Sequence, residues 1–354
     1  MPSPALSEAN DAVSFLVMPL VYALVFGLGL PGNIMALLVF SRDRKWLKKA
    51  VRVYLINLTV ADLLFNLTLP FWVSYYARGG HWLFGEVSCR LVGSLYYLST
   101  YCTITFMTLI SLDRYCTLRT RWTRLPMLRQ RGATVLCILI WAFWLSGAIP
   151  TLTMQQGFSN NPGQKSQTKC FESMSQEHVY SLVVCTFFAV SFLIVLLSYV
   201  SIIWSLGMRQ DHRVGSHRLQ AKAMVLGMLL VFLLCVAPFH ITLGLRVLLT
   251  WDDHAPYAMD ILHRINTALL SINSCIDPFI YCFSLRHFRS ELRVLWQDMG
   301  QALLHTPSAA RDTPSHRQPA LGGEPFNVLK ARFTSISTST SSTSRPVDIL
   351  HWGS

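Results

Sequence analysis

Seven apolar segments, each long enough to cross a membrane, constrain the fold of this chain more than any other feature of its sequence. The segments lie near residues 15–40, 51–76, 87–112, 133–152, 179–206, 223–249 and 258–285. A helix rises about 1.5 Å per residue, so about 20 residues cross the roughly 30 Å hydrocarbon core of a bilayer. Because hydrocarbon offers no water to free backbone groups, each segment is predicted to be helical. The expected fold is an all-α membrane protein, a bundle of seven transmembrane helices.

Charged residues are few, and they lie mostly between the apolar segments. The chain has 354 residues, of which 52% are hydrophobic and 14% are charged, and its formal net charge is +12. The basic residues cluster in the first, third and fifth connecting loops, whereas the second and fourth loops carry few of them. This pattern follows the positive-inside rule, so it indicates a cytoplasmic membrane face rather than a nucleic-acid partner. We therefore expect a multi-pass plasma-membrane protein with an extracellular N-terminus.

The two ends of the chain are expected to lie on opposite sides of the membrane. Residues 1–14 carry no cleavable signal and would form the extracellular N-terminus, ahead of a transmembrane domain at residues 15–285. Residues 286–297 alternate arginines with apolar residues at helical spacing, which predicts a short amphipathic eighth helix on the inner membrane surface. Residues 298–354 are rich in Pro, Ser and Thr, so they are expected to form a disordered tail open to phosphorylation. A tail that only adds solubility is the alternative.

The third apolar segment begins at a cysteine and ends at the triplet Asp113-Arg114-Tyr115. From Cys89 to Asp113 a helix would rise about 36 Å, which puts the charged pair at the far boundary of the membrane. Because burying ionisable groups there is unfavourable, the pair is interpreted as a conformational switch. An interfacial ion pair without a function is the alternative.

Nine cysteines divide into two groups. Seven lie in or at the ends of the apolar segments and are interpreted as buried thiols. The remaining two, Cys89 and Cys170, lie on the expected outer side, where the compartment is oxidising. We therefore predict a disulfide between them, which would hold the fourth loop to the outer end of the third helix.

Short motifs along the apolar segments resemble those of the rhodopsin-like family of G-protein-coupled receptors, in the same order. They are Gly32-Asn33, Leu58-Thr59-Val60-Ala61-Asp62, Asp113-Arg114-Tyr115, Trp141, Phe232 with Cys235 and Pro238, and Asn273 with Asp277-Pro278-Phe279-Ile280-Tyr281. Asp277 in place of an asparagine, Cys170-Phe171-Glu172 and His240 resemble the branch for nucleotides, lipids and protons. The resemblance implies a receptor rather than an enzyme. Its implied partners are a heterotrimeric G protein, arrestin bound through the phosphorylated tail, and an extracellular ligand.

The resemblance also implies roles for polar residues inside the bundle. Activation would release Arg114 from Asp113 as the inner half of the sixth helix swings outward about a kink at Pro238. The residues assigned to this switch are Asp113, Arg114, Tyr115, Tyr199, Pro238, Asp277, Pro278 and Tyr281. An allosteric sodium ion would be held by Asp62, Thr103, Asn273 and Asp277. A network without an ion, in which two carboxyl groups share a proton, is the alternative; no other cofactor is expected.

The ligand class follows partly by exclusion. Tyr96 and Tyr97 stand where an amine receptor has an acidic residue, and the seventh segment has no lysine to bind retinal. Leu243 stands where purine-nucleotide receptors place a basic residue, which weakens nucleotide recognition without excluding it.

The residues expected to form the ligand site are aromatic, with a few cations among them. They are Tyr22, Trp72, Tyr76, Tyr96, Tyr97, Tyr101, Phe171, Phe239, His240 and Arg246. Aromatic faces beside cations suit an amphiphile with a phosphate or quaternary ammonium head, so a lipid-like ligand is expected. Core packing alone is the alternative for any one of these aromatics. A receptor for nucleotides or protons is the alternative function.

Overall fold

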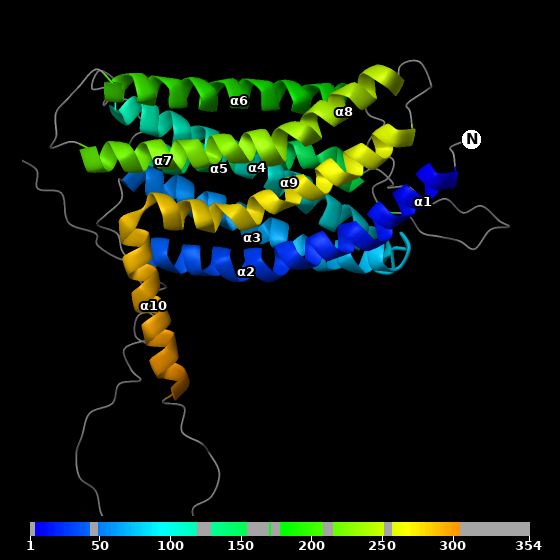
Figure 1. The fold of residues 1–354 in the computed structure, drawn as a ribbon, viewed down its shortest axis with the longest axis horizontal. Coiled ribbons are helices and arrows are strands. Elements are labelled where there is room, and N and C mark those ends of the chain that lie inside the picture. Colours follow the sequence, from blue (N-terminus) through cyan, green and yellow to red (C-terminus); the bar gives the residue numbers. More distant parts are fainter. Residues whose placement is uncertain are drawn as a thin grey trace, which may run out of the picture. The chain divides into compact units, whose positions relative to one another are not determined.

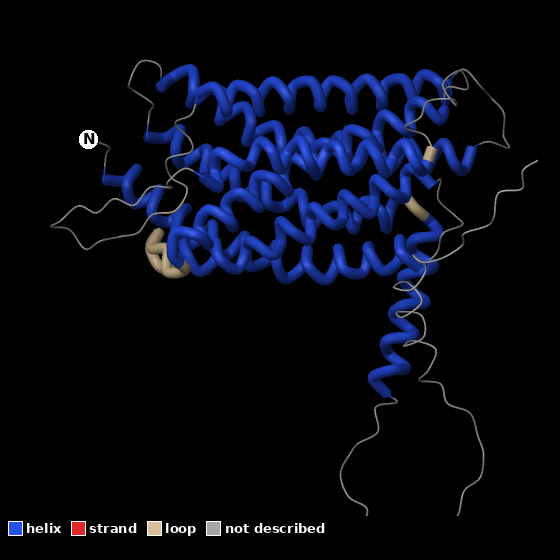
Figure 2. Tube along the Cα trace, turned by 180° about the vertical axis from the view of Figure 1, so that it is seen from behind, coloured by secondary structure: helices blue, strands red, loops and turns tan. Residues whose placement is uncertain are grey.

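The structure, a computed structural model, describes residues 4–42, 49–118, 129–153, 170, 178–207, 215–250 and 257–304. These residues form helices that lie side by side, as Figures 1 and 2 show from opposite directions. The helices are α1 (Pro4–Ala12), η1 (Val13–Val17), α2 (Met18–Arg42), α3 (Lys49–Ala77), α4 (Gly85–Leu118), α5 (Gln130–Thr153), α6 (His178–Gly207), α7 (Gly215–Val231), η5 (Phe232–Val236), α8 (Ala237–Thr250), α9 (Tyr257–Ser284) and α10 (Arg286–Leu304). No strand occurs among the described residues.

Some consecutive helices join end to end without a gap, so the described helices form seven spans followed by α10. Helices α1, η1 and α2 form the first span, and α7, η5 and α8 form the sixth. Six spans are long and apolar enough to cross a membrane by length and composition. The seventh, α9, has 28 residues, enough for about 42 Å of helix, but carries more polar side chains than the others. The prediction of an all-α bundle of seven transmembrane helices is confirmed.

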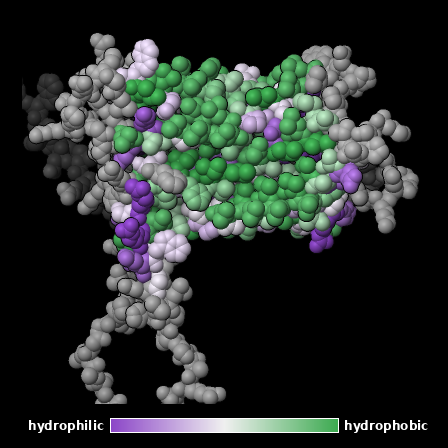
Figure 3. Space-filling model, viewed as in Figure 1, coloured by the Kyte–Doolittle hydropathy of each residue, from purple (hydrophilic) through white to green (hydrophobic). Residues whose placement is uncertain are grey.

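The surface of the bundle is apolar where lipid would surround it. Figure 3 shows hydrophobic residues over most of the visible face, with polar residues toward the two ends. On α5, for example, Ile138 and Phe143 are 62% and 64% exposed. Soluble proteins rarely expose so large a continuous apolar surface, whereas lipid tails cover it without a penalty.

Polar side chains inside the bundle find partners on neighbouring helices. Trp141 on α5 donates from Nε1 to Oδ1 of Asn57 on α3, at 2.9 Å. Asn33 on α2 is fully buried and donates from Nδ2 to the carbonyls of Gly29, at 2.9 Å, and of Ser274 on α9, at 2.7 Å. Such bonds matter here because a buried polar group without a partner is unfavourable.

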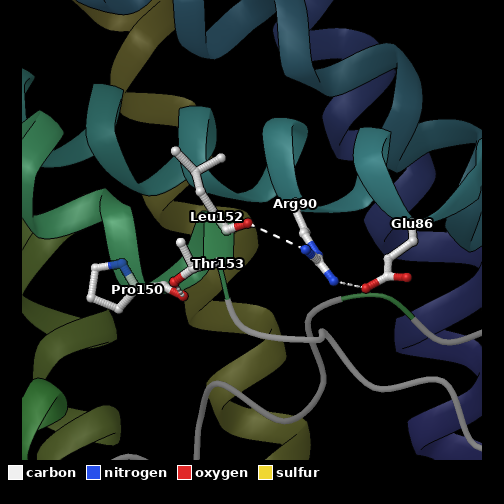
Figure 4. Close-up of polar contacts among 5 residues, drawn as sticks. All are labelled: Glu86, Arg90, Pro150, Leu152 and Thr153. Carbon is white, nitrogen blue, oxygen red and sulfur yellow. Dashed lines mark hydrogen bonds and ion pairs between the residues drawn. The ribbon is translucent and has the colours of Figure 1, made fainter.

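One end of the bundle, which we call the disulfide end, carries α1 and the bridge between Cys89 and Cys170. The two Cα atoms lie 5.8 Å apart, and the predicted disulfide is confirmed. Beside it, Arg90 on α4 pairs with Glu86 and donates to the carbonyl of Leu152 at the end of α5, at 3.4 Å (Figure 4). A cation at a helix C-terminus is favourable because the last carbonyl groups lack helical partners. These contacts fix the start of α4 next to α5.

Two boundaries differ from the expected ones. Helix α10 continues to Leu304 rather than ending at 297, because Leu295, Met299 and Leu303 extend the apolar helical spacing. Residues 298–304, expected to belong to a disordered tail, are therefore helical; residues 305–354 lie outside the described residues. At the other end, residues 4–12 are helical and lead into the first span. Helix α10 runs across the direction of the spans in Figure 1, as an amphipathic helix along a membrane surface would.

Candidate functional site

A cavity of about 220 Å³ lies at the disulfide end, between α2, α3, α4, α8 and α9. Its lining consists of Tyr22, Trp72, Tyr75, Tyr76, Tyr96, Tyr97, Cys170, Arg246, Asp260, His263, Arg264 and Thr267. The disulfide places Cys170 in this lining by tying it to the start of α4. Five spans and one loop residue thus converge on a single hollow, which is the usual form of a ligand site.

Aromatic rings form one wall of the cavity. The ring centroid of Trp72 lies 5.9 Å from that of Tyr96 and 6.3 Å from that of Tyr76, and Tyr22 lies 6.0 Å from Tyr76. These spacings are typical of packed aromatic pairs. Trp72 is only 7% exposed, so the wall is held by its own packing before any ligand arrives. Electron-rich ring faces of this kind attract cations.

Charged side chains from α8 and α9 form another part of the lining, which we call the charged wall. Arg246 on α8 pairs with Asp260 on α9 through Nη2 and Oδ1, 3.1 Å apart. Arg264 follows Asp260 by four residues, so it lies on the same face of α9, one turn along. Arg264 forms no ion pair with a carboxylate in the described part of the chain. Within the described ranges, the wall therefore presents one guanidinium in an ion pair and one without a carboxylate partner.

A chain of hydrogen bonds joins this wall to the proline of the sixth span. His263 Nδ1 and Thr242 Oγ1 lie 3.1 Å apart and share a hydrogen bond between α9 and α8. Asn266 donates from Nδ2 to Thr242 Oγ1 at 3.4 Å and to the carbonyl of Pro238 at 3.1 Å. The π-helical turn η5 ends just before Ala237 and Pro238, and it widens the helix where the proline lacks an N–H. A cavity residue is thus bonded to the segment most able to bend.

A second polar cluster lies deep between α3, α4 and α9. Thr103 donates from Oγ1 to Oδ1 of Asp62 at 3.0 Å, and the Asp62 carboxyl lies close enough to that of Asp277 to interact with it. Asp62, Asn273 and Asp277 each have one buried side-chain oxygen with no hydrogen-bond partner among the described residues. Such oxygens are the donors that a hard cation prefers. The four residues predicted to hold sodium therefore fit an ion of this kind.

Most of the predicted switch residues lie in the half of the bundle remote from the disulfide, whereas Pro238 stands near the middle of the sixth span. Asp113 is buried, and its charge acts on the guanidinium of Arg114 directly after it. Two nitrogens of Arg114, Nε and Nη2, are buried and have no hydrogen-bond partner in the described part of the chain. The ring of Tyr281 on α9 is fully buried, with its centroid 5.2 Å from that of Phe40. The remaining members are Tyr115 on α4, Tyr199 on α6, Pro238 on α8, and Asp277 and Pro278 on α9.

Comparison with known proteins decides the family. The profile described as "7 transmembrane receptor (rhodopsin family)" matches residues 32–281, from the start of the first motif to the last tyrosine of the seventh span. The chain belongs to the rhodopsin family of seven-transmembrane receptors. It is therefore a G-protein-coupled receptor, a multi-pass plasma-membrane protein and not an enzyme, and its family implies a G protein and an extracellular ligand as partners.

The receptor is similar to proteins that are named for different kinds of ligand. It is 32% identical to the platelet-activating factor receptor of Cavia porcellus over 301 residues, which is 81% of this chain and 87% of the relative. It is 31% identical to P2Y purinoceptor 4 of Rattus norvegicus (83% and 84%) and 33% identical to lysophosphatidic acid receptor 5 of Bos taurus (78% and 77%). Two short runs, Leu69-Pro70-Phe71-Trp72 and Lys169-Cys170-Phe171-Glu172, also resemble the platelet-activating factor receptor.

Six of the ten residues predicted to bind ligand line the receptor's cavity: Tyr22, Trp72, Tyr76, Tyr96, Tyr97 and Arg246. Phe171 lies outside the described residues. The other three, Tyr101, Phe239 and His240, are buried but are not part of this lining. The sequence alone could not separate the residues that line the cavity from the other three described ones, because nearly all of them are aromatic residues on spans.

Neighbouring rings account for two of the residues that lie away from the cavity lining. His240 stacks on Phe188 of α6, with centroids 4.5 Å apart and planes at 10°, and donates from Nδ1 to the carbonyl of Val236 at 2.9 Å. Tyr101 stacks on Trp144 of α5 at 4.9 Å. Both rings therefore already have partners on other spans.

Six lining residues are not among the ten predicted to bind ligand: Tyr75, Cys170, Asp260, His263, Arg264 and Thr267. The sequence does carry a signal for four of them, because Asp260, His263, Arg264 and Thr267 are spaced three, four and seven residues from the first and so share one helical face. A polar stripe at the start of an otherwise apolar span indicates a face turned to a polar cavity rather than to lipid.

Proposed function

We propose that the receptor binds an extracellular phospholipid-like amphiphile in the cavity at the disulfide end. The observation that carries this proposal is the pairing, in one hollow, of a wall of aromatic rings with a wall that holds Arg246 and Arg264. A phosphate head would be bound by the guanidiniums, and a quaternary ammonium by the ring faces. Two of the three relatives described above are named for phospholipids, which agrees with this chemistry.

Ligand binding would act on the sixth span through the cavity residues that touch the ligand. Arg246 stands on α8, whereas its partner Asp260 and the cavity residue His263 stand on α9. A head group bound by these residues would reset the distance between α8 and α9, and the bonds from Asn266 and Thr242 would pass that change to Pro238. A ligand shifts such an equilibrium only by its different affinities for the two states. Outward movement of the inner half, α7, would then open the site for the G protein and release Arg114.

The remaining roles expected from the sequence belong to the same proposal. The disulfide end and the N-terminus would be extracellular, and arrestin would bind the phosphorylated tail. Asp62, Thr103, Asn273 and Asp277 would hold a sodium ion, which would supply a positive charge between the two carboxyl groups in the resting state. A nucleotide is the second candidate ligand, because Arg246 and Arg264 both face the cavity and a purinoceptor is among the relatives.

The test is a ligand panel on cells that express the chain. Platelet-activating factor, lysophosphatidylcholine, lysophosphatidic acid, UTP, ATP and external pH steps from 6 to 8 would be compared for second-messenger output, with untransfected cells as the baseline. We expect a saturable response to a phospholipid and none to nucleotides or acid alone. Responses only to nucleotides or protons, with every phospholipid inactive, would overturn the proposal.

A matched pair of variants tests the site itself. Arg264→Gln removes the unpaired guanidinium from the cavity, whereas Arg78→Gln removes an exposed guanidinium in the turn between α3 and α4. Loss of one hydrogen bond to a charged head is worth roughly 1.5–3 kcal/mol, or about ten- to a hundredfold in affinity. We expect that loss of phospholipid potency for Arg264→Gln and no loss for Arg78→Gln, at equal surface expression.

A further inference from the structure

The charged side chains in the cavity lining carry too little net positive charge to neutralise a ligand with two negative charges. Arg246 and Arg264 bring two positive charges, and Asp260 brings one negative charge, so with His263 neutral the described residues of the lining carry a net charge of about +1. The Asp260 carboxylate lies 3.1 Å from the Arg246 guanidinium and offsets part of its positive charge, although its Oδ1 accepts no hydrogen bond among the described residues. Any anion bound at Arg246 must therefore lie beside a carboxylate.

The two head groups of common lysophospholipids place different demands on such a lining. A phosphomonoester carries a charge of about −1.5 to −2 at pH 7, so it would leave uncompensated negative charge next to Asp260. A choline phosphodiester carries one negative and one positive charge. Its phosphate matches the net charge of the lining, and its ammonium suits the faces of Trp72 and Tyr76 in the same cavity.

We propose that Asp260 is a specificity-determining residue that makes the cavity prefer a zwitterionic phosphodiester head over a phosphomonoester or nucleotide head. It does so by engaging Arg246, which leaves Arg264 as the principal group for a single negative charge. This inference rests on the proposed function, because it concerns which amphiphile enters the same cavity.

The ion pair of Arg246 and Asp260 could be purely structural or could set ligand preference, and the two roles lead to different expected results. The pair joins the ends of α8 and α9, so if it only holds these helices together, removing either member has the same effect on every ligand. If Asp260 sets the charge of the cavity, the two substitutions change ligand preference in opposite directions. Asp260→Asn raises the net charge of the lining by one unit, and Arg246→Gln lowers it by one unit.

The experiment compares two lipids with the same acyl chain, lysophosphatidylcholine and lysophosphatidic acid, on the full-length receptor. The quantity measured is the ratio of their half-maximal concentrations in a G-protein nucleotide-exchange assay, which does not depend on expression level. We expect Asp260→Asn to shift this ratio about tenfold or more toward lysophosphatidic acid, and Arg246→Gln to shift it toward lysophosphatidylcholine. Asp260→Glu, which keeps the carboxylate, should retain the wild-type ratio.

Glu86→Gln is the matched control, because it breaks an ion pair with Arg90 at the same end of the bundle but away from the cavity lining (Figure 4). It should leave the ratio unchanged. Shifts of the same sign in Asp260→Asn and Arg246→Gln, or an unchanged ratio in Asp260→Asn, overturn the assignment of Asp260 while leaving a phospholipid receptor in place. A wild-type chain that no phospholipid activates overturns the proposed function itself, and with it this inference.

Discussion

Gly227 allows α7 to pack directly against α9, and a single added methyl group tests whether these helices must separate during activation. A Cβ atom built on Gly227 would lie 3.0, 3.1 and 3.3 Å from three side-chain carbons of Ile280. Ordinary carbon contacts are about 3.5–4.0 Å, so all three distances are too short. Ile280 is only 7% exposed and has little room to move away. Gly227→Ala therefore overpacks the closed arrangement of the inner half of the sixth span.

The expected magnitude follows from this overlap. Overpacking of a well-packed interior costs about 1–3 kcal/mol, and outward movement of α7 would relieve it. The closed state alone is then destabilised, which shifts the closed-to-open ratio by roughly 5- to 150-fold. A receptor whose open state is populated at about 0.1–10% before the change would signal clearly without a ligand after it.

Basal nucleotide exchange on a purified G protein, in membranes with equal receptor density, measures this shift. Gly147→Ala on α5 is the matched control, since a Cβ there meets no atom within 4 Å and the change in helix propensity is the same. Adding Ile280→Ala to Gly227→Ala removes the three clashing atoms and should return basal exchange toward that of Ile280→Ala alone. If Gly227→Ala shows wild-type basal exchange at full surface expression, the outward swing of α7 from α9 is not the activating movement.

Three further predictions concern other parts of the receptor. Arg114→Ala should keep surface expression and ligand binding but reduce ligand-stimulated nucleotide exchange to background; normal signalling would disprove its role as a switch. Cys170→Ser removes a bridge between residues 81 positions apart, so it should lower the unfolding free energy by about 2–5 kcal/mol. An unchanged thermal unfolding midpoint of the solubilised receptor would contradict this. Sodium chloride should weaken agonist binding to the wild type relative to potassium chloride, and Asp62→Asn should abolish that difference. A sodium effect that persists in Asp62→Asn would show that the ion, if bound, lies elsewhere.

The spans were predictable from sequence because they depend on a property that is local in the chain. About 20 consecutive apolar residues are sufficient to predict a helix in lipid, whatever that helix packs against. The end of α10 was predicted too early, because Gly300 disfavours a helix while the apolar spacing of Leu295, Met299 and Leu303 continues past it. The disulfide was predictable because the topology leaves two cysteines on one side of the membrane, and Cys89 and Cys170 are joined in the structure.

Contacts within the site depend on how each helix is rotated, which the sequence specifies only through its packing partners. Trp72 and Tyr96 were expected near the ligand and line the cavity, whereas His240 packs on Phe188 instead. Nothing in the residues around His240 indicates that α6 would present a ring to it. The same limit applies to Arg246, whose partner Asp260 comes from a different span. An arginine read alone indicates an anion site, but its effective charge depends on a carboxylate 14 residues away.

The hydrogen bond from Asn33 to the carbonyl of Ser274 also bears on how the chain is made. It joins the first span to the last, across 241 positions of sequence. Spans are synthesised in order, so Asn33 enters the membrane long before its acceptor exists, and one of its two amide hydrogens has no water to bind there. An unsatisfied buried donor of this kind is unfavourable by about 1–3 kcal/mol. A chain cut short before α9 lacks this acceptor, so its Asn33 amide keeps an unsatisfied hydrogen that the complete receptor satisfies.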